Sequence, residues 1–264
     1  MEPYHEGERK GFYYDGSPRS QEFYKNGKLE GKCKWWWHNG NLWKHEFYRN
    51  GKLEGERKEW WSDGSLNKSE MYKNGELEES KEYYSNGQIR SYKCYKNRLM
   101  EGEYKTWHDT GQLMAVLPFR NGLEEGPRKC WHENGHLYVD EFWHEGKREG
   151  ESKKWHENGM ILTHALYVNG LVNGRVRGWY EHGLVFFQEF FIGGKLEGER
   201  KQWENNGHIM THKFFLNGNC VDDQFTTNGK FILLRLKRHL GKCAYEKKIP
   251  MLNSFFISDL VGLV

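Results

Sequence analysis

Histidine is the residue type whose number and spacing first suggest chemistry in this chain. The sequence holds 13 His, and His108, His132 and His156 follow one another at intervals of 24 residues. Imidazole is a common zinc ligand and a general acid or base near neutral pH. If each interval spans two β-strands, these side chains lie about 9.6 Å apart, whereas a zinc ion needs each nitrogen at about 2.1 Å. We therefore predict exposed sheet histidines and no metal site; a pair such as His132 with His136 stays open.

Carboxylates are the second group that could do chemistry, but they recur along the chain at the same period. An acid/base pair built from them would be repeated many times, whereas an enzyme normally has one site. The sequence contains no GxSxG, Walker A or HExxH motif and no glycine-rich dinucleotide loop after a strand. We predict that the protein is not an enzyme and takes no cofactor.

Composition limits the class of protein further. Hydrophobic residues make up 36% of the chain and aromatic residues 16%, so aromatic side chains supply much of the apolar surface and disorder is not expected. Residues 230–264 carry seven Lys or Arg against Glu246 and Asp259, a net charge of +5, which leaves about −2 for residues 1–229. A near-neutral body of this kind does not favour specific nucleic-acid binding.

The cysteines and the absence of targeting segments indicate the compartment. The five cysteines are odd in number and form no CxxC pair, so neither a disulfide framework nor a structural zinc site is expected. The N-terminal segment has no apolar signal region, and the longest apolar stretch is too short to span a bilayer. We predict a cytoplasmic protein.

The elements that must position these residues are set by an internal repeat. One series of glycines recurs at 24 residues with a single interval of 23: Gly16, Gly40, Gly64, Gly87, Gly111, Gly135, Gly159, Gly183 and Gly207. A second series follows 11 residues later throughout, with Arg98 in one place, and a third precedes the first by nine within a Leu-Glu-Gly phrase. Asn usually precedes the glycine of the first two series, which predicts two-residue hairpin turns. Nine units thus cover residues 4–218, and the chain is predicted to be all-β: an elongated antiparallel meander over residues 1–229 with a C-terminal helical cap over 230–264.

Aligned on the first glycine series, the units show fixed columns. Aromatic residues lie four positions before the glycine, Lys or Arg six before, aliphatic residues two after, and Tyr, Phe or Trp eight after. With a two-residue turn, position −4 pairs with +3 and position −3 with +2. The aromatic −4, basic −6 and apolar +7 columns would then share one face, and the +2, +8 and Glu-rich +6 columns the other.

These columns resemble those of a known repeat family. The unit Y-K-N-G-K-L-E-G-x-x-K-x-W-x-x-N-G-x-L is similar to the MORN repeat, specifically the variant found in bacterial antitoxin-like proteins. The common MORN unit has a Gly-Lys-x-His-Gly core, whereas Glu stands in place of that His here, as at Glu30 and Glu54. The resemblance implies a repeat scaffold and a toxin-neutralising inhibitor as one alternative, while the Glu departs from the pattern linked to acidic-lipid binding.

The variable columns predict where a partner protein would bind. Position −3 and the Trp35–Trp37 run supply the aromatic and imidazole side chains of this candidate surface, namely Trp35, Trp37, Trp61, Tyr84, His108, His132, His156 and Tyr180. A helical spacing after Lys230 places basic residues on one outer face, namely Arg235, Lys237, Arg238 and Lys242. We therefore expect a non-catalytic scaffold for another protein. Docking of the basic segment on an anionic membrane is an alternative to a simple cap, and self-association stays open.

Overall fold

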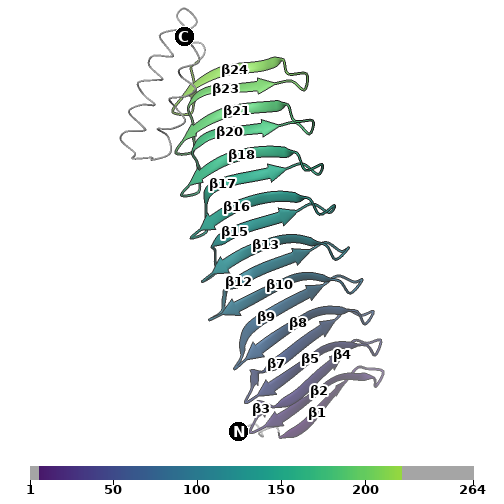
Figure 1. Cartoon of the computed structure of the whole chain (residues 1–264). Helices are drawn as coiled ribbons and strands as arrows, with labels where there is room; N and C mark the ends of the chain where they lie inside the picture. The colour runs from purple at the N-terminus through teal and green to yellow at the C-terminus, as the bar shows by residue number, and fades with distance from the viewer. Residues whose placement is uncertain (1–5, 222–264) are drawn as a thin grey trace, which may run out of the picture. The chain divides into compact units, whose positions relative to one another are not determined.

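The computed structural model describes residues 6–221, and every regular element in that range is a β-strand. Consecutive long strands pair antiparallel, as Figure 1 shows, so the predicted all-β meander is confirmed. The predicted helical cap and the boundary near residue 229 lie outside the described residues, and the count of nine units stays a prediction. The chain divides into two compact units, residues 1–147 and 148–264.

The strands of each unit are short and follow one another closely. The first unit contains β1 (Gly7–Phe12), β2 (Pro18–Lys25), β3 (Lys28–Leu29), β4 (Gly31–Trp36), β5 (Leu42–Arg49), β6 (Lys52–Leu53), β7 (Gly55–Trp60), β8 (Leu66–Lys73), β9 (Glu76–Tyr83), β10 (Ile89–Lys96), β11 (Leu99–Met100), β12 (Gly102–Trp107), β13 (Leu113–Arg120), β14 (Leu123–Glu124), β15 (Gly126–Trp131) and β16 (Leu137–His144). At and after the boundary come β17 (Lys147–Trp155), β18 (Ile161–Val168), β19 (Leu171–Val172), β20 (Gly174–Trp179), β21 (Val185–Ile192), β22 (Lys195–Leu196), β23 (Gly198–Trp203), β24 (Ile209–Leu216) and β25 (Asn219–Cys220).

The second glycine series forms the predicted two-residue turns. Asn50 and Gly51 have φ angles of 52° and 76°, and the flanking Arg49 and Lys52 pair directly. Positive φ at both central residues is the signature of a type I′ turn, which matches the right-handed twist of the strands. The Asn-Gly dipeptide is needed here because few other residues adopt this conformation without strain.

The first glycine series forms a different turn, and the two-residue prediction is wrong there. Gly40 has a φ of 86°, while Asn39 is not among the residues with positive φ. The Gly40 N–H donates to the Trp37 carbonyl at 2.9 Å, and the Trp37 N–H donates to the Asn41 carbonyl at 2.8 Å. This is a type I turn followed by a glycine bulge, a longer hairpin loop than the sequence pattern suggested.

This longer loop changes the strand pairing next to it, and an extra residue in the following strand restores the expected register. In β7–β8, Glu59 pairs with Lys68 as expected, but Trp60 pairs with Leu66, so Asn67 is the extra residue. The predicted pairing of −4 with +3 is therefore wrong: the −4 column lies opposite the aliphatic +2 column. Since paired residues share a face, the two columns are not separated onto opposite faces as predicted.

The remaining columns lie on the faces predicted for them. Pairing of Arg57 with Glu70 and of Glu56 with Met71 separates the −7, +6 and +8 columns from the −8, −6 and +7 columns. We name the first the Glu–Tyr face and the second the lysine face. The Glu–Tyr face holds the buried residues of the strands, which are small or ionised: Cys33, Glu46, Glu70, Ser80, Ser91, Thr106, Ala115, Val139 and Glu141 in the first unit and Ser152 and Ala165 in the second.

The Glu of the Leu-Glu-Gly phrase joins each second-series turn to the next one along the chain. The Glu30 carboxylate accepts a hydrogen bond from the Asn50 N–H at 2.7 Å, and the glycine after it, Gly31, has a φ of 79°. Equivalent bonds join residues 20 positions apart along the chain: Glu6 with Asn26, Glu54 with Asn74, Glu101 with Asn121, Glu125 with Glu145, Glu149 with Asn169 and Glu197 with Asn217. A charge-assisted bond of this kind satisfies the exposed N–H of a strained turn.

Candidate binding surface

The side chains at position −3 form a second ladder between repeats, at the ends of the first-series turns. The Trp37 indole N–H donates to the Trp60 carbonyl at 3.1 Å, 23 residues away along the chain. Corresponding bonds to the −4 carbonyl of the next repeat are made by Tyr13 to Trp36 (2.7 Å), Tyr84 to Trp107 (2.8 Å), His156 to Trp179 (2.9 Å) and Tyr180 to Trp203 (2.8 Å). A residue at position −3 must therefore carry a hydrogen-bond donor on an aromatic ring, which explains why Trp, Tyr and His occur there.

This ladder gives four of the eight predicted partner residues, Trp37, Tyr84, His156 and Tyr180, a structural contact. Trp37, Tyr84, His108, His132, His156 and Tyr180 are half-buried at the turn ends. Trp61 differs, since its side chain is 47% exposed and its indole N–H has no partner among residues 6–221. The next repeat along the chain is the one that is a residue short, before Gly87, and none of its carbonyl groups accepts the Trp61 indole N–H. Trp61 is thus the exposed aromatic residue of its column.

The Trp35–Trp37 run does not form a single exposed patch. Trp35 lies on the Glu–Tyr face, where the Lys44 ammonium sits 4.0 Å from its ring centre, while Trp36 pairs with Leu42 and Trp37 lies at the turn. All three are half-buried. Adjacent residues of a strand point to opposite faces, so three consecutive tryptophans serve three different contacts.

Sequence reasoning missed the aromatic side chains at position +3. Trp43 is 39% exposed and its ring centre lies 5.3 Å from that of Trp37. The same −3 to +3 contact joins His132 to Tyr138 at 4.8 Å and Tyr180 to Phe186 at 5.0 Å. Position +3 is the extra residue of the bulge, so it packs on the turn instead of on a paired residue. The column of large apolar residues was the available signal, but the assumed register assigned it to an ordinary pair.

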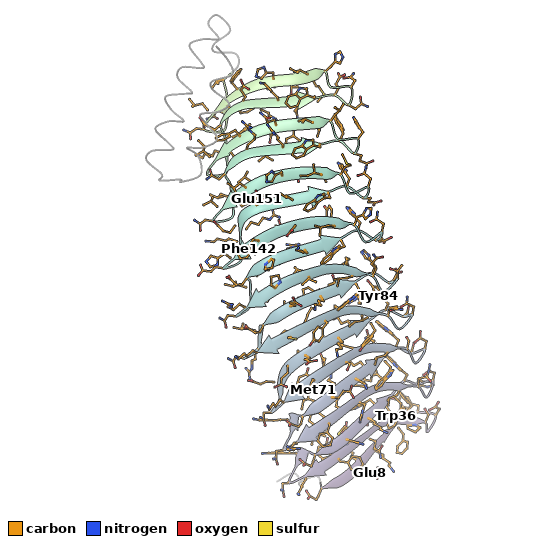
Figure 2. The ribbon with its side chains drawn as sticks, in the orientation of Figure 1. Glu8, Trp36, Met71, Tyr84, Phe142 and Glu151 are labelled. Atoms are coloured by element: carbon orange, nitrogen blue, oxygen red, sulfur yellow. The ribbon has the colours of Figure 1, made fainter. Side chains whose placement is uncertain are left out.

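Alternation along β5 places His45 and Phe47 together on the lysine face. Beside them lies an open groove of about 520 Å³ that Phe47 and Met71 help to line; Met71 is labelled in Figure 2. Met71 is 40% exposed. The groove lies where the two extra residues Glu54 and Gly55 interrupt the pairing of β5 with β7. Gly55 has no Cβ, and one added there would meet nothing within 4 Å, so the space above it is open.

His45 lies at the side of this groove. Its Nε2 atom is buried and has no hydrogen-bond partner among the described residues. Burial, together with the charges of Lys34 and Lys32, lowers the pKa of His45 below its usual value. A neutral imidazole with an unused polar atom can accept or donate one further hydrogen bond.

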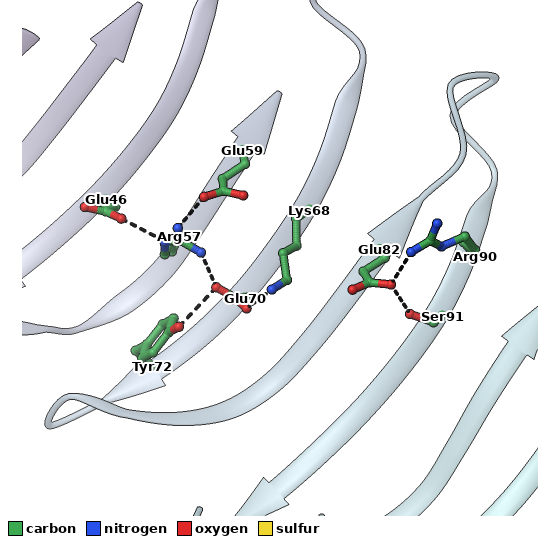
Figure 3. Close-up of polar contacts among 9 residues, drawn as sticks. All are labelled: Glu46, Arg57, Glu59, Lys68, Glu70, Tyr72, Glu82, Arg90 and Ser91. Atoms are coloured by element: carbon green, nitrogen blue, oxygen red, sulfur yellow. Dashed lines mark hydrogen bonds and ion pairs between the residues drawn. The ribbon is translucent and has the colours of Figure 1, made fainter. Parts of the chain in front are cut away.

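The opposite, Glu–Tyr face carries a network of ionised groups centred on Arg57 (Figure 3). Its guanidinium donates to Glu46 at 2.7 Å and also to Glu59 and Glu70, joining three strands. Burial by itself raises the pKa of Glu46, but bonds from Tyr48 and Arg57 lower it below the usual value. Burial and the Glu70 charge raise the pKa of Tyr72 to about 12. Every ionised group here is paired, so the network stabilises the sheet and leaves no free reactive group.

Other predicted features cannot be placed or are not seen in the described range. Arg235, Lys237, Arg238 and Lys242 lie outside the described residues. Within residues 6–221 no three His, Cys, Asp or Glu side chains are grouped as metal ligands. No helix in this range is long and apolar enough to cross a bilayer. The described cysteines, Cys33, Cys94, Cys130 and Cys220, are free thiols.

Comparison with known proteins agrees with the repeat geometry. The family model described as "MORN repeat variant" matches seven stretches that together exceed half of the chain: residues 6–26, 29–50, 53–74, 79–97, 100–121, 124–145 and 148–169. The chain belongs to the MORN repeat variant family. Four of the matched MORN stretches, those that start at 29, 53, 100 and 124, begin within the short strand that follows a second-series turn. The placement of this chain in an antitoxin-like subfamily is not established by the match.

Other comparisons add little. No curated protein matches the sequence. Among solved structures, chains from "Crystal Structure of TcdB2-TccC3-Cdc42" and "Crystal Structure of TcdB2-TccC3-TEV" match with TM-scores of 0.19 and 0.21, each at 8% identity over 87% of this chain. This chain spans 14% of the length of those chains. Such low scores carry no argument about fold or function.

Proposed function

We propose that this MORN-repeat chain is a non-catalytic scaffold that binds another protein through the exposed tryptophans of its first unit, Trp43 and Trp61. The observation that carries the proposal is the exposure of Trp43 and Trp61, at 39% and 47% of their side chains. Large aromatic residues dominate protein interfaces because each buries much apolar area and offers a polar N–H. The indole of Trp61 has no partner among the described residues, so a bound protein can satisfy it.

The alternatives rest on other parts of the chain or on resemblance alone. Inhibition of a toxin-like partner would be one specific form of scaffold binding, suggested only by the similarity to antitoxin-like MORN proteins. Membrane docking by the basic segment concerns residues that the structure does not describe. The free thiols of the described cysteines favour a reducing compartment such as the cytoplasm.

Affinity purification from the source cells, followed by mass spectrometry, tests the scaffold proposal. The full chain is compared with a W43A/W61A double variant and with Y138A, which removes another +3 aromatic residue that is 37% exposed. We expect a partner that is retained by the wild type and Y138A and lost by W43A/W61A. Equal retention by all three proteins, or no reproducible partner, would count against the proposal. Circular dichroism confirms that each variant is folded.

A further inference from the structure

The groove on the lysine face of the first unit differs from the rest of that face in charge. At position −8 most repeats carry a Glu that pairs with the −6 Lys two residues on, as in Lys58 with Glu56 at 2.8 Å and Lys105 with Glu103 at 2.7 Å. In the second repeat Lys32 replaces that Glu. Lys32 is exposed and makes no ion pair with any described residue, so its charge is available to a ligand.

The other charged residues that line the groove differ in whether they already have a hydrogen-bond or ion-pair partner within the protein. Glu54 accepts the Asn74 N–H at 2.7 Å and lies 3.9 Å from Arg49, and Glu56 is paired with Lys58. Lys73, like Lys32, has no ion-pair partner in the part of the chain that the structure describes. Glu78 is the one lining carboxylate without a bond there. The groove therefore offers two unpaired cations against one unpaired carboxylate.

The floor between these cations is apolar. Phe47 and the exposed Met71 provide a surface for one aliphatic or aromatic side chain, and the open space above Gly55 lets an extended backbone approach. An apolar contact with a few polar groups around it is the usual arrangement of a ligand site.

We propose that this groove binds an extended acidic segment of a partner protein, with one apolar side chain on Phe47 and Met71 and carboxylates at Lys32 and Lys73. This inference rests on the scaffold function and names the chemistry of the partner. A nucleic acid fits less well, since every nucleotide carries a phosphate, whereas a peptide can place uncharged residues beside Glu54, Glu56 and Glu78, which also line the groove. Methionine at the floor adapts its shape to different apolar side chains.

Methionine-methyl NMR on the full chain tests this site directly. The seven Met residues give few signals, and M71L assigns that of Met71. The probes are the capped pentapeptides Asp-Glu-Phe-Asp-Glu, Lys-Arg-Phe-Lys-Arg and Asp-Glu-Gly-Asp-Glu. We expect the first to shift the Met71 methyl to saturation, with Met114 and Met160 unchanged, and the other two to bind at least about tenfold more weakly.

Charge-reversal variants provide the matched comparison. The K32E/K73E double variant should weaken binding of the acidic peptide about tenfold, because both pairs become repulsive. K96E reverses the residue equivalent to Lys73 in the next hairpin, outside the groove, and should leave binding within about twofold of the wild type. These changes affect exposed side chains, so all three proteins should fold.

Several outcomes would overturn the assignment. Absence of a Met71 shift, or equal binding of acidic and basic peptides, removes the acidic-segment site. A stronger Met71 response to phosphatidylserine vesicles or to oligothymidylate would assign the groove to lipid or nucleic acid instead. The scaffold proposal would survive either result, because the W43A/W61A purification tests it through different side chains.

Discussion

The third and fourth hairpins of the first unit, β7–β8 and β9–β10, differ by the loss of one residue. In the third, Gly55 forms a bulge with a φ of 74° and Glu54 accepts the N–H of Asn74, in the turn that follows β8. In the fourth, β9 runs without interruption from Glu76 to Tyr83, and Glu79 needs no glycine conformation. With one residue fewer, the pairing of β8 with β9 has one extra residue, Glu78, where the regular repeat has two, and no glycine conformation is needed.

The same deletion removes contacts between repeats. Regular repeats are joined by the −3 side chain, by the Glu carboxylate and by the N–H of the second-series glycine, as in Gly75 to the Leu53 carbonyl at 2.8 Å. At the fourth hairpin the corresponding groups are Trp61, Asn97 and Arg98, and none makes this bond with another described residue. All three contacts therefore require the regular 24-residue spacing. Trp61 is exposed because that spacing is one residue short in the next repeat.

The largest expected difference between the two hairpins concerns the residue at position −7, which is Arg57 in the third and Ser80 in the fourth. Arg57→Ala would leave Glu46 and Glu70, which are only 3% and 5% exposed, without their shared cation. We expect a loss of about 3 to 5 kcal/mol in the free energy of unfolding. Ser80→Ala should cost under about 1 kcal/mol. Urea unfolding followed by circular dichroism measures both, and equal effects would show that the network does not hold the third hairpin.

The same network predicts a pH dependence that belongs mainly to the third hairpin. The pKa values of Glu46 and Glu70 lie below the usual 4.5, since bonds to Arg57, Tyr48 and Lys68 outweigh the effect of burial. Lowered folded-state pKa values stabilise the protein above pH 4.5, and that stability is lost as pH falls through them. The E46Q/E70Q variant should be less stable at pH 7 and lose less on acidification. An unchanged acid limb of the urea midpoint would contradict this account.

A smaller difference is expected from the two turn-capping positions. Glu54→Ala removes the acceptor of the Asn74 N–H and should cost about 1.5 kcal/mol, the contribution of a charged hydrogen bond. Glu78→Ala removes no such bond, so its cost should stay under about 0.5 kcal/mol. Amide exchange at Asn74 gives the local readout. Faster exchange at Asn74 in E78A than in E54A would reverse the comparison.

The sequence predicted the strands and two of the face assignments because they depend on simple periods. The spacing of turn glycines requires short strands, and alternation places Lys58 with Met71 and Glu70 with Tyr72 whatever the turn type. It did not predict the bulge at Asn67, because the Asp63-Gly64 dipeptide, like Asn-Gly, is compatible with both turns and the choice depends on bonds across the loop. The exposure of Trp61 was not predictable either, since it follows from a carbonyl missing in the next repeat.

Arg98 offers the smallest and most local test of the comparison. It occupies the second-series glycine position with a φ of 66°, and its ion pair with Glu76 at 3.3 Å is exposed. A left-handed conformation costs a residue with a side chain about 1 kcal/mol, more than an exposed ion pair contributes. Arg98→Gly should therefore stabilise the protein by up to about 1 kcal/mol, and Arg98→Asn by less. As a control, Arg120→Gly changes an arginine at a strand end with ordinary φ and should destabilise the protein. If R98G lost stability by a similar amount, the arginine side chain, and not the backbone conformation, would decide the stability of this turn.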